Sequence, residues 1–234
     1  MPRVRTGADV TLVVLVYRSL KWLRWCMEGV DASKNTAHYR WLVVANDGTD
    51  EVRNSPLVDI DWQNENPAEY YIGRVYKAWQ EGVRCALTDR VVMLNSDMYP
   101  ADYWLDELLA ADTPTPRVLP TSALVESGRI PSGMPELVRD FGQTTDGFDA
   151  HGFRTHADTL RRPGIVEPGR LYMPILVHRQ EFFDIGGYPE GNPPGTTGDK
   201  DLVARYAKAG IRHVTACGSI VYHTQEGEMR ELNP

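Results

Sequence analysis

The sequence predicts an α/β fold in which helices cover both faces of a mostly parallel central sheet. The 234 residues are 42% hydrophobic and 24% charged, a composition that allows a globular protein to bury a sizeable core. Short apolar runs rich in β-branched residues alternate with helical periodicity through the first half of the chain, as in β-α-β units. Because no linker of biased composition interrupts the chain, we expect one domain over 1–234.

The first half contains the clearest elements. Its apolar runs suit strands that are buried on both faces, and its helices have apolar residues at a spacing of three or four. Trp79 lies on such an apolar helical face and is expected in the core. The expected strands are 10–17, 39–45, 58–62 and 91–94, and the expected helices are 20–30 and 68–86.

The second half is more mixed. We expect helices at 100–109, 179–185 and 199–209, and strand material at 117–125, 171–178 and 211–221. Pro120 has no backbone N–H, which favours an edge position for its strand. The stretch 127–168 is irregular apart from a possible helix near 134–141, and so long a loop is usually functional. His151 and His156 are expected there as solvated loop residues rather than metal ligands.

Charge and cysteine content exclude several classes of protein. With 25 Lys and Arg against 32 Asp and Glu, the net charge of -7 does not favour general binding of polyanions. No apolar run is long enough for a membrane span, and the amino terminus lacks the apolar core of a signal peptide. Cys26, Cys85 and Cys217 are widely spaced, which favours free thiols. A cytoplasmic location is therefore expected.

Polar residues end the buried strand Val91–Leu94. Asn95, Ser96 and Asp97 follow at its carboxyl end, where open α/β sheets bind their ligands. A carboxylate beside two small oxygen-bearing side chains suits a hard divalent cation that also holds phosphate oxygens. The alternative is an ordinary polar turn. Trp104, shortly after this motif, is either core or a residue that stacks on a sugar.

Three further polar residues occupy comparable positions. Asp47 follows the second strand, Asp199 opens a helix beside a glycine-rich loop, and His223 follows the last strand. Because strand ends converge on one edge of such a sheet, these residues can meet in one cleft. Each has a simpler interpretation: Asp47 as a turn former, Asp199 as a helix-terminal acidic residue, and His223 as an exposed strand-end histidine.

The order of several motifs resembles family 2 glycosyltransferases, the inverting enzymes of the GT-A fold that use nucleotide sugars. The resemblance runs from Val10 to His223. It implies a single GT-A (Rossmann-like) domain with a donor-binding half at about 9–100 and an acceptor or catalytic half at about 101–225. The motifs that carry it are VTLVVLVYRS, VVANDGTD, VVMLNSDMYP, FFDIGGYPEG, GDKDLVARYAKAG and IVYH.

The resemblance implies roles in donor binding for the residues at the ends of the first, second and fourth expected strands. Tyr17 and Arg18 lie where the family's chain passes the nucleotide base, and Asp47 matches the residue that holds the base or ribose. Asn95, Ser96 and Asp97 match the DXD motif, in which Asp97 is a metal ligand. Asn46 and Asn95 stand where the family has aspartates, so this site carries less negative charge than the family pattern.

The resemblance also implies a metal site and a catalytic base. Asp97 and His223 would bind a divalent cation, Mn²⁺ or Mg²⁺, which are normal partners for carboxylate and imidazole. Asp199 matches the catalytic base that deprotonates the acceptor hydroxyl as it attacks. Gly198 replaces the glutamate that usually precedes this base.

The leading hypothesis is a metal-dependent inverting glycosyltransferase that moves a sugar from a nucleoside-diphosphate sugar to an acceptor hydroxyl. One alternative is a nucleotide-sugar binding module without catalysis. Another is a transferase that glycosylates modified bases in viral DNA, for which Arg154, Arg161, Arg162 and Arg170 supply positive charge unless they serve a mobile lid. A nucleotidyltransferase is a third possibility, but no glycine-rich phosphate loop with a lysine follows the first strand.

Overall fold

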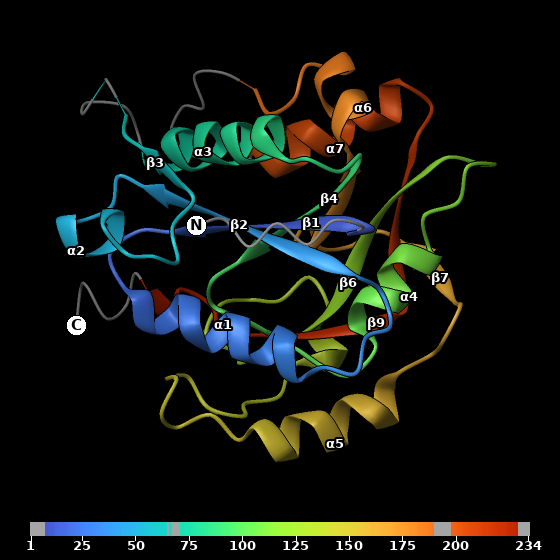
Figure 1. Cartoon of the computed structure of the whole chain (residues 1–234). Coiled ribbons are helices and arrows are strands. Elements are labelled where there is room, and N and C mark those ends of the chain that lie inside the picture. Colours follow the sequence, from blue (N-terminus) through green and yellow to red (C-terminus); the bar gives the residue numbers. More distant parts are fainter. Residues whose placement is uncertain (1–7, 65, 67–70, 190–197, 229–234) are drawn as a thin grey trace.

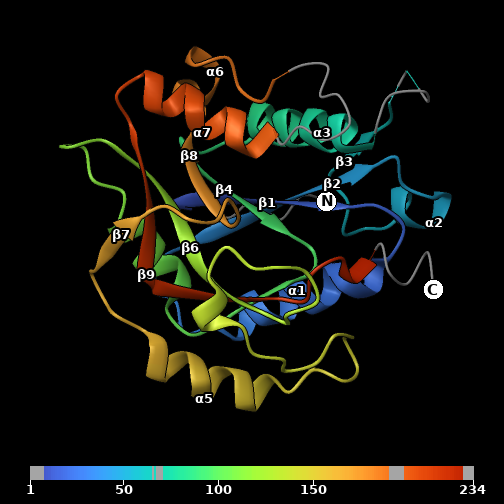
Figure 2. The same ribbon diagram turned by 180° about the vertical axis from the view of Figure 1, so that it is seen from behind.

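The computed structural model describes residues 8–64, 66, 71–189 and 198–228. Within them, a nine-stranded sheet has the order β3-β2-β1-β4-β8-β6-β9-β5, and β7 pairs with β9. Helices α3 and α7 lie on one side of the sheet and α1 on the other, with α5 outermost below α1 (Figures 1 and 2). The predicted α/β fold with helices on both faces is therefore confirmed.

The first half forms an all-parallel part of the sheet. β1 pairs with both β2 and β4, and β2 pairs with β3, always in parallel. The carboxyl ends of these strands consequently lie at one edge of the sheet, as the sequence predicted. The elements are β1 (Val10–Val16), α1 (Leu20–Ala32), β2 (Tyr39–Asn46), α2 (Asp50–Arg53), β3 (Ile60–Trp62), α3 (Tyr71–Cys85) and β4 (Arg90–Asn95). The helix expected from residue 68 starts outside the described residues.

The second half adds antiparallel pairs. β8 runs antiparallel to β4 and β6, while β5 and β7 run antiparallel to β9; β6 and β9 are parallel. The elements are β5 (Met98–Pro100), α4 (Trp104–Ala110), β6 (Val118–Glu126), the 3₁₀ helix η1 (Pro135–Leu137), α5 (Ala150–Leu160), β7 (Val166–Pro168), β8 (Ile175–His178), α6 (Arg179–Asp184), α7 (Gly198–Lys208) and β9 (Arg212–His223).

The expectation that Pro120 marks an edge strand is wrong. β6 lies between β8 and β9 in the sheet. The N–H of Ser122 donates to the carbonyl of Pro174 at 3.1 Å, so the nitrogens of Ser122 and Pro120, two residues apart, face β8. β8 pairs with β6 only through Thr121 and Ile175. Pro120 therefore occupies an interior strand without losing a ladder hydrogen bond.

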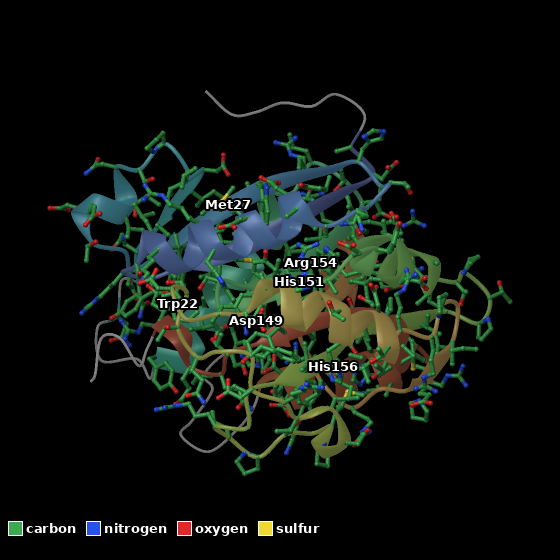
Figure 3. All side chains as sticks on the ribbon, turned by 90° about the horizontal axis from the view of Figure 1, so that it is seen from below. Trp22, Met27, Asp149, His151, Arg154 and His156 are labelled. Carbon is green, nitrogen blue, oxygen red and sulfur yellow. The ribbon has the colours of Figure 1, made fainter. Side chains whose placement is uncertain are left out.

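The stretch 127–168 is more regular than predicted. It contains α5, whose Phe153 and Ala157 are buried, whereas the helix expected near 134–141 is reduced to η1. Asp149 caps α5, because its side chain accepts a hydrogen bond from the N–H of Gly152 at 2.8 Å. His151 and His156 therefore lie on a helix rather than in a loop, and Figure 3 shows them beside the labelled Asp149.

The structure places both tryptophans singled out in the sequence, Trp79 and Trp104, in the core. Trp79 is buried, as predicted. Trp104 is fully buried as well, so it cannot stack on a sugar and that interpretation is wrong. Gly210 follows α7 with a φ of +81°, the left-handed conformation that favours glycine at the end of a helix. The three cysteines are free, as expected.

Among the residues described, no helix is both long and apolar enough to cross a membrane.

Candidate active site

A cleft of about 260 Å³ opens at the carboxyl ends of β1, β2 and β4. Five of the predicted donor-binding residues line it: Tyr17, Asp47, Asn95, Ser96 and Asp97. The far wall comes from α3, and the carboxyl-terminal segment contributes two glutamates. The other lining residues are Leu15, Val16, Asn46, Tyr71, Arg74, Val75, Trp79, Glu226 and Glu228. Sequence-distant strand ends are thus brought together as their topology requires.

Asp47 is fixed by its backbone and by two partners. It has a φ of 51°, in the left-handed region that is unusual for a residue other than glycine. Its carboxylate accepts the N–H of Asn64 at 2.7 Å and pairs with Arg74 at 2.9 Å. The neighbouring Asn46 is 7% exposed, and its Oδ1 has no hydrogen-bond partner among the described residues. This buried oxygen is available to a ligand donor group, because leaving it unsatisfied is costly.

Asp97 and His223 meet at the edge of this cleft. β5 pairs antiparallel with β9 in a register that sets Met98 opposite His223. The imidazole Nε2 lies 3.4 Å from Oδ2 of Asp97, and Nδ1 lies 3.2 Å from Oε1 of Glu126. Burial alone would lower the pKa of His223, but the two carboxylates raise it to about 10. Because its side chain is 19% exposed, the interpretation of His223 as an exposed strand-end residue is wrong.

The charge of Asp97 depends on its neighbours. Burial favours the neutral acid, but His223 and the N–H of Gly227, which donates to Oδ2 at 3.1 Å, outweigh that effect and lower the pKa of Asp97. Glu126 likewise has a lowered pKa, because contact with His223 outweighs its burial. The protein thus buries two carboxylates in their charged form around one positive group.

These residues fit a divalent cation. Two atoms bound to one small cation lie about 3 Å apart, and the Asp97–His223 pair is separated by 3.4 Å. The imidazolium occupies a place where positive charge is needed, and it would lose its proton to become a ligand. The described residues gather no group of three or more His, Cys, Asp or Glu that could hold a metal ion. Further ligands would therefore come from a bound substrate or water.

The segment after β9 wraps around Asp97. The N–H of Thr224 donates to the backbone carbonyl of Asp97 at 3.2 Å. Gln225 and Glu226 both have a φ of 61°, which stores backbone strain at two successive residues. The Gln225 side chain holds this turn: its Nε2 donates to the carbonyl of Ile130 at 2.9 Å, and its Oε1 accepts the N–H of Ile130 at 2.9 Å.

Glu228 binds the backbone between β1 and α1. Its carboxylate accepts the N–H groups of Tyr17 at 3.4 Å, Ser19 at 2.6 Å and Arg18. Ser19 is the N-cap of α1, and Tyr17 and Arg18 directly precede it, so the carboxylate lies near the positive end of the helix dipole. Burial nevertheless raises the pKa of Glu228. The guanidinium of Arg18 lies 4.6 Å from the centre of the Tyr17 ring, and Arg18 does not line the cleft.

Asp199 lies beside the cleft rather than in its lining. It is in the first turn of α7 and contacts Tyr76 of α3, which directly follows the cleft residues Arg74 and Val75. Tyr76 donates to Oδ2 of Asp199 at 3.1 Å, and Tyr188 donates to Oδ1 at 3.3 Å. Burial raises the pKa of Asp199, although both hydrogen bonds oppose the shift. A higher pKa makes this carboxylate a stronger base.

The four arginines singled out in the sequence for binding nucleic acid each contact a carboxylate. Arg154 reaches from α5 to Asp102 and to backbone carbonyls of α1, and Figure 3 shows it where the two helices meet. The other three pairs are Arg161–Glu107 at 4.0 Å, Arg162–Glu167 at 2.7 Å and Arg170–Glu136. Each of these side chains therefore already has an acidic partner within the protein.

Sequence reasoning missed part of the cleft. Arg74 and Tyr71 share one face of α3 with Val75, so helical spacing from that residue would have found them. Glu226 and Glu228 follow the last strand in a polar tail and carry no sequence signal. Tyr76, which binds Asp199, had only an indirect signal, the glycine at position 198.

No known family model and no curated protein sequence matches this chain. Solved structures do resemble it. S. aureus TarS 1–349 superposes with a TM-score of 0.58 at 14% identity, over 96% of this chain and 63% of that one. GalNAc-T7 with UDP, GalNAc and Mn²⁺ gives a TM-score of 0.61 at 14% identity, over 92% of this chain and 44% of that one. The chain has the GT-A glycosyltransferase fold, and it spans less than two thirds of either neighbour's length.

Proposed function

We propose that this chain is a metal-dependent, inverting glycosyltransferase of family 2 type. It moves a sugar from a nucleoside-diphosphate sugar to an acceptor hydroxyl by direct displacement. The donor-binding half is about 9–100 and the acceptor half about 101–225, together in one domain. The observation that carries the proposal is the pairing of Asp97 with His223 at 3.4 Å beside a cleft at the carboxyl ends of parallel strands.

The charge of the cleft supports the need for a cation. Among the described residues, its lining includes the carboxylates of Asp47, Asp97, Glu226 and Glu228 but only one basic side chain, Arg74. Such a cleft repels a bare diphosphate. Asp97 and His223 would hold Mn²⁺ or Mg²⁺ there, and the cation would supply Lewis-acid stabilisation to the diphosphate as its charge increases.

The nucleoside is held by groups around the ends of β1 and β2. Asp47, fixed by Arg74, accepts hydrogen bonds from the base or ribose, and the unpartnered Oδ1 of Asn46 accepts another. Tyr17 and the backbone of Arg18 border the base. Asn95 and Ser96 contact the ribose or phosphates as the uncharged part of a modified DXD motif.

The chemical step uses Asp199. The acceptor oxygen forms a bond to the anomeric carbon from the face opposite the diphosphate, and the bond from that carbon to the diphosphate oxygen breaks. The nucleoside diphosphate leaves with the electron pair, and Asp199 takes the proton of the acceptor hydroxyl. The raised pKa of Asp199, caused by burial, makes it a stronger base for this transfer.

A two-stage experiment tests the proposal. A thermal-shift screen of nucleotide sugars with Mn²⁺ or Mg²⁺ identifies the donor, because only a ligand of the folded state raises the melting temperature. Donor hydrolysis and transfer are then compared among wild type, Asp97→Ala, Asp199→Asn and Asp201→Asn. Asp201 is the matched control, since it is an exposed acidic residue in the same turn of α7.

We expect Asp97→Ala and Asp199→Asn to lose turnover and Asp201→Asn to keep it. Asp199→Asn should still bind the donor, because that residue does not line the cleft. Full activity in both Asp97→Ala and Asp199→Asn would contradict the mechanism.

A second candidate is a nucleotide-sugar binding module without catalysis. It is favoured by the position of Asp199 outside the cleft lining, together with Asn95 and Gly198 in place of acidic residues. Calorimetry that detects donor binding, with no turnover across a broad acceptor panel, would support this candidate. The viral-DNA transferase stays a prediction, and salt-dependent binding to duplex DNA would test it.

A further inference from the structure

The carboxylate of Asp199 is held by two tyrosine hydroxyls. Each oxygen has one of them: Tyr76 donates to Oδ2 at 3.1 Å and Tyr188 to Oδ1 at 3.3 Å. The two donors come from distant parts of the sequence, one from α3 and one from the turn after α6. Two hydrogen bonds to the two oxygens of one carboxylate fix the orientation of its plane, which a single bond would leave free to turn.

The two tyrosines form one packed unit. Their rings stack with centroids 4.5 Å apart and an interplanar angle of 21°, and both side chains are buried. Phe182 closes the far side of Tyr188 with centroids 5.9 Å apart. The hydroxyl positions are therefore set by ring packing that does not depend on Asp199.

Gly198 is part of the same arrangement. A Cβ at this position would lie 2.4 Å from Cε2 of Tyr76, so no larger residue fits while the ring stays in place. The related pattern has a glutamate before Asp199. In this chain the Tyr76 ring occupies the space that such a side chain would need. Gly198 therefore leaves room for the Tyr76 ring at the start of α7.

We propose that Tyr76 and Tyr188 are positioning residues that orient the Asp199 carboxylate and keep it ionised for proton transfer. This inference rests on the proposed function, in which Asp199 deprotonates the acceptor. The tyrosines act through Asp199 and do not touch the reacting atoms. In an acidic pair, the neighbour of Asp199 would be a charged carboxylate. Here its neighbours are two neutral hydroxyl donors.

The groups around Asp199 explain why its ionisation depends on these hydroxyls. Tyr76 faces it from α3, Tyr188 from the turn after α6, and Tyr172 from the segment before β8; Tyr206 lies behind Tyr188 on α7. Among the described residues, no cation contributes to the shift of Asp199. Burial raises the pKa of this carboxyl and the two hydroxyls oppose that rise, so removing either one should raise the pKa further.

Tyr→Phe variants isolate the hydroxyls because they keep the stacked rings. Tyr76→Phe and Tyr188→Phe each remove one donor, and Tyr206→Phe is the matched control. The Tyr206 hydroxyl is equally buried but has no hydrogen-bond partner among the described residues. A purely structural role of buried tyrosine hydroxyls would affect the three variants through stability alone.

The first measurement is the pH profile of kcat/KM for donor hydrolysis by the full chain with Mn²⁺. We expect the acidic limb to move to higher pH by about one unit in Tyr76→Phe and in Tyr188→Phe, and to stay in place in Tyr206→Phe. Unmoved limbs in both variants, with Asp199→Asn inactive, would overturn the positioning role and leave the base in place. Activity that survives in Asp199→Asn would instead refute the base.

The second measurement does not depend on turnover. Carbon-13 NMR of protein labelled at aspartate Cγ follows each carboxyl directly, and the resonance missing from Asp199→Asn identifies the one of interest. We expect its titration midpoint to rise by about one unit in Tyr76→Phe relative to wild type and Tyr206→Phe. An unchanged midpoint would overturn the inference even if the wild-type protein transferred no sugar.

Discussion

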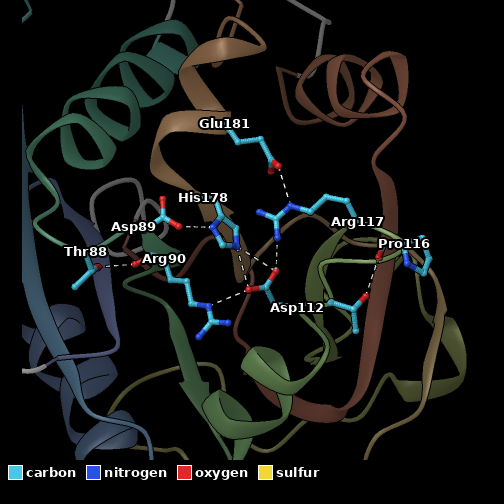
Figure 4. Close-up of polar contacts among 9 residues, drawn as sticks. Thr88, Asp89, Arg90, Asp112, Pro116, Arg117, His178 and Glu181 are labelled. Carbon is cyan, nitrogen blue, oxygen red and sulfur yellow. Dashed lines mark hydrogen bonds and ion pairs between the residues drawn. The ribbon is translucent and has the colours of Figure 1, made fainter.

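The two ends of β4 both gather charged residues, and they use them in opposite ways. At the amino end, carboxylates alternate with cations in a branched network of ion pairs (Figure 4). At the carboxyl end, Asp97 shares its one histidine with Glu126, and Glu228 is held by backbone N–H groups. Charge that is balanced within the protein holds the fold together. Charge left partly unbalanced beside a cleft is available to a ligand.

The network at the amino end is centred on Asp112, whose side chain is 2% exposed. It receives Arg90 at 2.9 Å, Arg117 at 3.0 Å and His178 at 3.0 Å. The outer contacts are His178 with Asp89 and Arg117 with Glu181. The cluster therefore joins β4, the end of α4, the start of β6 and the end of β8. Every charged side chain of the cluster contacts one of opposite charge, which is typical of a structural role.

The largest effect expected from this comparison is on activity. Asp97→Asn should reduce kcat for donor hydrolysis by about a thousandfold, because it removes a ligand of the divalent cation that would stabilise the leaving diphosphate. The asparagine keeps an oxygen for the Gly227 N–H, and Glu126 still pairs with the His223 imidazolium, so the melting temperature should fall less than in Asp112→Ala. Steady-state rates with Mn²⁺, beside a thermal melt, check both statements. A wild-type kcat in Asp97→Asn would show that activity does not need the charge at the carboxyl end of β4. The proposed difference between the two ends would then be refuted.

Asp112→Ala should produce the opposite result. Removing the centre of a buried network takes a carboxylate partner away from Arg90, Arg117 and His178, which costs about 3 kcal/mol of unfolding free energy. Urea unfolding measures this loss, and kcat per folded molecule should stay near that of wild type. Glu136→Gln is the control, since it breaks the exposed pair with Arg170 and should cost less than about 1 kcal/mol. Equal losses in the two variants would contradict the structural role of Asp112.

The donor side of the cleft predicts a smaller change. Arg74→Gln releases Asp47 from its 2.9 Å ion pair, and we expect the donor Kd to rise about tenfold because the carboxylate loses its fixed position. Isothermal calorimetry with Mn²⁺ measures it. Arg84→Gln provides the comparison on the same helix, where Arg84 pairs with Glu81 away from the cleft. An equal change in both variants would mean that Asp47 needs no support from α3.

The smallest expected effect is the pH dependence of stability. Hydrogen bonding to Asp112 raises the pKa of His178 above 6.5, so its contribution is complete below pH 6.5 and lost as the pH rises through the folded pKa. Burial opposes ionisation of Asp112, but His178 and the arginines lower its pKa below 3.8. That contribution is complete above pH 3.8 and lost in stronger acid. The network therefore stabilises most between these two values.

Urea unfolding across this range tests the sign. The difference in unfolding free energy between wild type and His178→Gln should be largest near pH 5 and should shrink as the pH rises above 6.5. A difference that grows with pH would show that His178 is neutral in the folded protein.

The sequence allowed the parallel half and much of the cleft to be predicted for the same physical reason. Apolar runs identify buried strands, and parallel strands bring their carboxyl ends to one edge of the sheet. Asp47, Asn95 and Asp97 needed only that rule to be placed together. His223 is the last residue of β9, which pairs antiparallel with β5, so the resemblance was needed to give it a role in the metal site.

The rest depends on contacts that leave no local pattern. In α5 only Phe153 and Ala157 are buried, so its apolar periodicity is weak. Glu228 meets the backbone of Arg18 across 210 residues. In the turn before Glu228, Gln225 and Glu226 have positive φ. Neither is a glycine, so the sequence gives no sign of this conformation. Tertiary contacts decide each of these features, and propensity does not.

The irregular pairing of β6 with β9 has a consequence for the cleft. Ser122 is opposite Ala216, but the next residue, Ala123, is opposite Ile220, so residues 217–219 are passed over. Had the first register continued, Glu126 would face Ile220, since each strand advances four positions. Instead it faces His223. These three extra residues of β9 determine which of its later side chains lie opposite those of β6. They determine whether an imidazole or an aliphatic side chain arrives beside Asp97, and they do so from a position several residues away.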